Sequence, residues 1–81
     1  MRISRMVMKA IETYLNLPYR LIITPDDEGG YGVEVVELPG CVTYAQTWEA
    51  IPAMVREAMA AWIGSALQHD DPIPLPKRET A

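Results

Sequence analysis

The sequence is poor in residues that signal redox, metal or membrane chemistry. It holds one cysteine, Cys41, and one histidine, His69. A single cysteine cannot form a disulfide within the chain, and neither a zinc-ligand spacing nor a glycine-rich phosphate loop is present. No apolar run approaches the roughly 18 residues that indicate a membrane span, and charged residues interrupt the N-terminal stretch where a signal peptide would be apolar. We therefore expect a cytoplasmic protein without a metal, a cofactor or a membrane partner.

Basic residues are scarce in most of the chain. Residues 21–71 carry nine acidic residues against Arg56 alone, whereas residues 1–20 carry four basic residues against Glu12. Nucleic-acid binding needs cations that neutralise phosphates, so the acidic body argues against direct DNA or RNA binding. It suits a basic protein partner, or it is simply a solvated surface. With 81 residues the chain has room for one small core, which makes self-association plausible.

Two amphipathic helices are predicted from apolar residues at spacings of three and four. The first covers residues 3–16 and ends before Pro18. The second is about 20 residues long, with Thr47 as its N-cap and Glu49 in its first turn. Pro52 lies early in this helix, where it removes one hydrogen bond and loosens the first turn. The first helix is expected either to cover the second or to pair with another copy in a homodimer.

Three strands are predicted between the helices. Residues 19–24 are rich in β-formers, residues 31–36 alternate with a period of two, and residues 41–45 follow a break made by Pro39 and Gly40. The element order predicts an α+β fold. It is a three-stranded antiparallel meander, with or without a short fourth strand, packed with two helices. We divide the chain into a helix at 1–18, a domain at 19–70 and an extended or disordered proline-rich tail at 71–81.

The residues capable of chemistry are scattered, which predicts that the protein is not an enzyme. Residues 26–28 are expected at an exposed hairpin tip, with a divalent-cation site as the alternative. Glu34 and Glu37 lie an odd number apart and so point to opposite faces of a regular strand. Cys41 is expected to be a small buried side chain rather than a nucleophile. His69 is expected to be a surface residue at a helix end rather than a metal ligand or base.

Both tryptophans, Trp48 and Trp62, fall on the apolar stripe of the second helix. This position favours burial in the core over a ligand cage.

The central segment GGYGVEVVELPGCVTYAQTWEA, followed by an alanine-rich helix, resembles the HicB-like antitoxin family. In that family a tyrosine-led strand enters a Leu-Pro-Gly-Cys turn, and a Thr-x-Glu sequence opens the helix. The resemblance covers about residues 19–76 and implies a degraded ribonuclease H-like α+β fold that lacks the catalytic carboxylates. The matching positions are Gly30, Tyr31, Glu34, Glu37, Leu38, Pro39, Gly40, Cys41, Thr47 and Glu49.

The resemblance implies that the chain binds and neutralises a HicA-like toxin, a small basic RNA-cleaving protein. An acidic surface over a basic groove would block RNA both sterically and electrostatically. We expect the turn Leu38, Pro39, Gly40 and Cys41 to shape the backbone. The expected contact residues are Asp26, Asp27, Glu28, Glu34 and Glu37.

Two other functions remain open. One is a stand-alone, homo-oligomeric structural or regulatory protein without a toxin, and the other is a metal-dependent nuclease that retains ribonuclease H chemistry. The chain departs from the family pattern at Ala45 and Gln46, where Gly-Asp is common, and at Pro52. Many relatives also carry a C-terminal DNA-binding segment. This sequence ends in PIPLPKRETA, so we do not expect it to bind an operator by itself.

Overall fold

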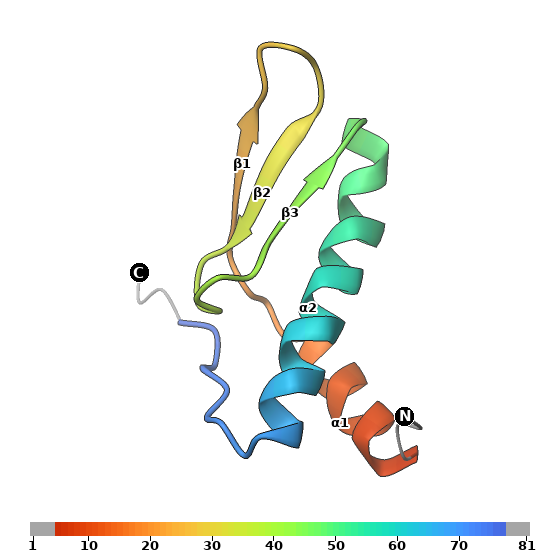
Figure 1. The fold of residues 1–81 in the computed structure, drawn as a ribbon, viewed down its shortest axis with the longest axis vertical. Helices are drawn as coiled ribbons and strands as arrows, with labels where there is room; N and C mark the ends of the chain where they lie inside the picture. The colour runs from red at the N-terminus through yellow and green to blue at the C-terminus, as the bar shows by residue number, and fades with distance from the viewer. Residues whose placement is uncertain (1–4, 78–81) are drawn as a thin grey trace.

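The computed structural model describes residues 5–77, which form three strands and two α-helices (Figure 1). In chain order these are α1 (Arg5–Leu15), β1 (Leu21–Pro25), β2 (Tyr31–Val35), β3 (Val42–Ala45), a 3₁₀ turn η1 (Trp48–Ala50) and α2 (Ile51–Gln68). The predicted α+β meander is confirmed. The described residues contain no fourth strand. The expected start of the first helix, at residues 3 and 4, and the end of the tail, residues 78–81, lie outside the described part of the chain.

The strands form one antiparallel sheet in the order β1-β2-β3. The register pairs Ile23 with Val33 and Val33 with Thr43, so alternate residues form an inner face toward α2 and an outer face away from it. Val33 and Val35 are buried on the inner face. Opposite them α2 presents a buried stripe at helical spacing, consisting of Ile51, Val55, Met59, Ile63 and Ala66.

Helix α1 packs on α2. Ile11 is its one buried residue, and its Cδ1 atom lies 3.5 Å from where a Cβ atom at Gly64 would be. The missing side chain at Gly64 therefore gives Ile11 its space. Val7, Tyr14 and Leu15 pack around the same core. Of the two roles expected for the first helix, covering the second helix is the one described here.

The second helix begins later than the sequence predicts. Thr47 does act as a cap, since its Oγ1 accepts a hydrogen bond from the Ala50 amide at 3.2 Å. The capped element, however, is η1, with Glu49 in its first turn, and α-helical geometry starts at Ile51. Pro52 consequently lies in the first turn of α2, where its missing N–H would have had no partner within the helix.

The tip of the β1–β2 hairpin is fixed to β3 by Tyr44. The Tyr44 hydroxyl donates a hydrogen bond to the Gly29 carbonyl. The tip is also closed by backbone bonds in which the Gly29 amide donates to Asp26 and the Asp26 amide donates to Gly30, each at 3.0 Å. Gly29 and Gly30 have φ values of 102° and 85°, which only glycine adopts readily.

We expect Gly30→Ala to destabilise the protein more than Gly29→Ala. Both substitutions force a side chain into a left-handed backbone, which costs about 1–3 kcal/mol. At Gly30 the new Cβ would also clash with the Tyr44 hydroxyl oxygen, whereas at Gly29 it would meet nothing within 4 Å. Thermal unfolding of the two variants measures the difference. Equal losses of stability, or a Gly30→Ala penalty that is undiminished in a Tyr44→Ala background, would contradict the contact.

Candidate functional site

The outer face of the sheet is exposed and partly apolar. One cross-strand row consists of Ile22, Glu34 and Val42, and the next of Thr24, Gly32 and Tyr44. Ile22 is 52% exposed and Val42 is 63% exposed. Helix α2 lies on the opposite face, so no described element covers these rows (Figure 1). Exposed apolar side chains grouped on one face are typical of a protein-binding surface.

A shallow groove runs along this face between β1 and β3. Gly32, in the central strand, leaves the groove open because it has no side chain. Near the hairpin tip the groove is lined by Thr24, Asp26, Asp27 and Tyr44. Toward the other end of the strands it is lined by Ile22, Glu34, Val42 and Thr43. We call this surface, together with the tip at residues 26–28, the outer groove.

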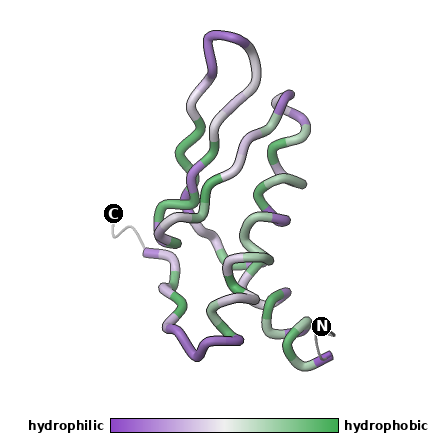
Figure 2. Tube along the Cα trace, in the orientation of Figure 1, coloured by the Kyte–Doolittle hydropathy of each residue, from purple (hydrophilic) through white to green (hydrophobic). Residues whose placement is uncertain are grey.

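Four of the five predicted contact acids lie in or beside the outer groove. Asp26, Asp27 and Glu28 are exposed at the hairpin tip, and Glu34 is exposed on the strand. Figure 2 shows the tip as one of the most hydrophilic parts of the chain. One Asp26 carboxylate oxygen accepts a bond from the Glu28 amide at 3.1 Å and so helps to hold the tip. No strand position on this face carries lysine or arginine, and Arg20, which precedes β1, is paired with Glu37.

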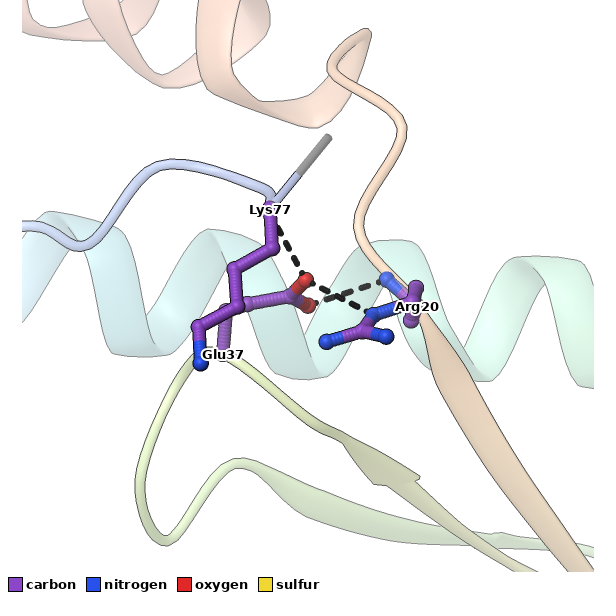
Figure 3. Close-up of polar contacts among 3 residues, drawn as sticks. All are labelled: Arg20, Glu37 and Lys77. Atoms are coloured by element: carbon purple, nitrogen blue, oxygen red, sulfur yellow. Dashed lines mark hydrogen bonds and ion pairs between the residues drawn. The ribbon is translucent and has the colours of Figure 1, made fainter. Parts of the chain in front are cut away.

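Glu37 is placed elsewhere. Its side chain is 4% exposed and accepts three hydrogen bonds from segments that are distant in sequence (Figure 3). The Lys77 amide donates to Oε2 at 3.0 Å, the Arg20 amide donates to Oε1 at 3.0 Å, and Arg20 Nε donates to Oε2 at 3.1 Å. The carboxylate therefore ties the start of β1 and the tail to the end of β2. This position does not support the contact role that the sequence predicted for Glu37.

These bonds favour the ionised carboxylate. The Lys77 amide, and then the Arg20 amide and guanidinium, lower the pKa of Glu37 from 4.5 to about 2, against the opposing effect of burial. Residues 71–77 of the tail form neither helix nor strand. Tyr19 adds a second attachment for them by donating its hydroxyl to the Pro74 carbonyl at 2.5 Å.

The turn at residues 38–41 connects β2 to β3 and contacts α2 through Trp62. The Cys41 amide donates to the Leu38 carbonyl at 3.0 Å, with Pro39 and Gly40 between them and Gly40 at φ 79°. This is the pattern of a type II turn. Leu38 is fully buried, and Trp62 Nε1 donates to the Pro39 carbonyl at 2.8 Å. Burial raises the pKa of the Cys41 thiol, which disfavours the thiolate form.

The aromatic and metal-ligating residues give a mixed result. Trp62 is partly buried against the core, but Trp48 is 58% exposed, so its predicted burial is wrong. Trp48 lies in η1, before the α-helical stripe begins, and meets Tyr31 edge-on with ring centroids 5.6 Å apart.

His69 caps the end of α2, with Nδ1 2.8 Å from the Ser65 carbonyl oxygen. Among residues 5–77, no three histidine, cysteine or acidic side chains are grouped to hold a metal. Over the same range, no helix is long and apolar enough to cross a bilayer.

We expect the stability contributed by Glu37 to be lost in acid. The pKa of Glu37 is lower in the folded chain than in the unfolded chain, where it is 4.5. This stability is therefore fully present when the pH is above 4.5. It decreases as the pH falls toward the folded value of about 2. Glu37→Gln should therefore unfold at a lower temperature than the wild type at neutral pH. The difference between the two melting temperatures should disappear as the pH falls from 4.5 to about 2. Circular dichroism melts measure both effects, with exposed Glu34→Gln as the control. A gap that is independent of pH would contradict the assignment.

Two comparisons with known proteins place the chain. Residues 19–80 match the model of a family described as HicB-like antitoxin of bacterial toxin-antitoxin systems. The chain is also 40% identical over 58 residues to a UPF0150 protein of Thermoplasma acidophilum, a match that covers 72% of this chain and 84% of the relative. The match spans the sheet, the turn at residues 38–41 and α2. The chain therefore belongs to the HicB-like antitoxin family.

Proposed function

We propose that the chain neutralises a small, basic, RNA-cleaving HicA-like toxin in the cytoplasm by covering the toxin's active site with the outer groove. Family membership supports a non-catalytic role and a toxin partner in general. The observation that carries the specific proposal is the outer groove itself. It combines exposed Ile22 and Val42 with acids at residues 26–28 and 34, and its strand positions hold no cation.

The chemistry of the outer groove suits such a partner. An enzyme that cleaves RNA presents cations to phosphates, so the acids of the outer groove would compete for the same positions. Ile22 and Val42 supply an apolar centre that excludes water, and the acids of the tip form a polar rim. The tip is held by Tyr44 and the Asp26 carboxylate, so few groups need to be ordered on binding. Glu37 is not part of this proposed interface.

The first experiment is co-expression with a HicA-like protein encoded beside this chain's gene. The expected result is a complex that survives purification and does not degrade RNA, while the partner alone does. If no such neighbour exists, or if the two proteins do not associate at low salt, the proposal fails. The alternative, a homo-oligomeric protein without a toxin, would then be favoured, since the exposed apolar strand β1 offers a surface for it.

We expect Asp27→Lys and Glu34→Lys to weaken toxin binding about 10-fold or more each, equivalent to ~1.4 kcal/mol, and to reduce its salt dependence. These two acids are chosen because neither accepts a described hydrogen bond that holds the fold, unlike Asp26 and Glu37. Glu57→Lys, an exposed position on α2, is the matched control and should leave affinity close to that of the wild type. Calorimetric titration at two salt concentrations measures the effect. Equal losses in all three variants would remove the outer groove from the interface.

A further inference from the structure

Strand β1 is an open sheet edge whose backbone groups can be assigned. The Val36 amide donates to the Arg20 carbonyl and the Asp26 amide donates to the Gly30 carbonyl, so the even-numbered residues of this segment face β2. Hydrogen-bonding direction alternates along an antiparallel strand. The N–H and C=O groups of Leu21 and Ile23 therefore point away from β2, where no described strand pairs with them. Pro25, which lacks an N–H, takes the next outward position.

Both faces of β1 are also apolar and incompletely covered. Leu21 is 39% exposed on the inner face and Ile22 is 52% exposed on the outer face. Helix α2 packs on β2 and β3, and Figure 1 shows β1 at the side of the sheet away from α2. The opposite edge, at β3, differs because α2 contacts β3 and covers its inner face. An open apolar edge that carries no charge within the strand invites pairing with another strand.

We infer that β1 pairs with β1 of a second copy in an antiparallel, two-fold symmetric dimer, which joins the two sheets into one of six strands. The register follows from the outward groups. Leu21 of each copy lies opposite Ile23 of the other, so each such pair exchanges both of its hydrogen bonds, and the two-fold axis passes beside Ile22. A register that brought Pro25 opposite Leu21 would lose one of these bonds, because Pro25 has no donor.

The charges at the two ends of β1 are complementary under this symmetry. Arg20 precedes the strand; its side chain is 43% exposed, and its Nε donates to the Glu37 carboxylate of its own chain at 3.1 Å. Asp26 follows the strand and lines the outer groove. Both lie on the outer face by alternation. In the inferred register, Arg20 is opposite Thr24 of the second copy and diagonal to its Asp26, within reach of a long side chain. The two-fold axis repeats this pairing, so a second copy fits the edge in charge as well as in hydrogen bonding. The inference does not depend on toxin binding.

The test is site-directed cross-linking of the purified full chain. The two Ile22 residues form a non-hydrogen-bonded pair with Cα atoms about 4.5 Å apart, within the ~4.4–6.8 Å that a disulfide spans. Ile22→Cys should therefore form a covalent dimer on mild oxidation. Val42→Cys is the matched control, since it is equally accessible on the same face. In the inferred dimer the two Val42 positions are five strand spacings apart, roughly 24 Å, so this variant should not cross-link.

Sedimentation equilibrium provides a second arm without cysteine chemistry. The wild type should form a dimer, and Leu21→Pro should raise the dimer dissociation constant at least tenfold because it removes one outward donor. Val42→Pro, which removes a donor at the β3 edge, should not. Wild-type protein that stays monomeric up to millimolar concentration would overturn the inference. So would cross-linking of Val42→Cys as fast as Ile22→Cys, or a wild-type dimer in which neither variant cross-links. A Leu21→Pro chain that fails to fold leaves the cysteine pair to decide.

Discussion

The width of one helix limits what this small core can cover. An α-helix with its side chains is about 10–12 Å across, and neighbouring strands lie about 4.8 Å apart, so a single helix covers two strands of a sheet. Helix α2 covers β2 and β3, and α1 packs on α2 instead of on the sheet. The inner side of β1 is only partly covered, with Ile23 packed against the core, and no described element covers the outer face. Both proposed binding surfaces arise from this shortage, which is common in small domains.

Local patterns predicted most of the fold. The alternation at residues 31–36 placed β2 to within one residue, since the strand ends at Val35, and proline and glycine at 39 and 40 correctly marked the turn between two strands. The stripe of α2 predicted its buried residues because α-helical spacing holds from Ile51 onward. Trp48 was assigned to the same stripe. The chain has 3₁₀ geometry there, so the spacing no longer indicates which side chain is buried.

The candidate site was predicted less completely, for two physical reasons. Glu34 and the acids of the tip could be placed because β2 alternates and the tip is a turn of glycines and acids. In β1, Leu21, Ile22 and Ile23 are all apolar, so periodicity does not indicate which of them faces outward. The role of Glu37 could not be predicted because its partners, Arg20 and Lys77, lie 17 and 40 positions away. No local pattern carries such a contact.

The attachment of the tail to Glu37 connects segments that are far apart in the sequence at one end of the sheet. The Arg20 amide, before β1, and the Lys77 amide, after α2, donate to the same carboxylate. The Lys77 amide has the largest effect in lowering the pKa of Glu37, so a chain cut before Lys77 would lose that effect. A cut in the tail would therefore weaken the sheet at a site distant in sequence from the cut.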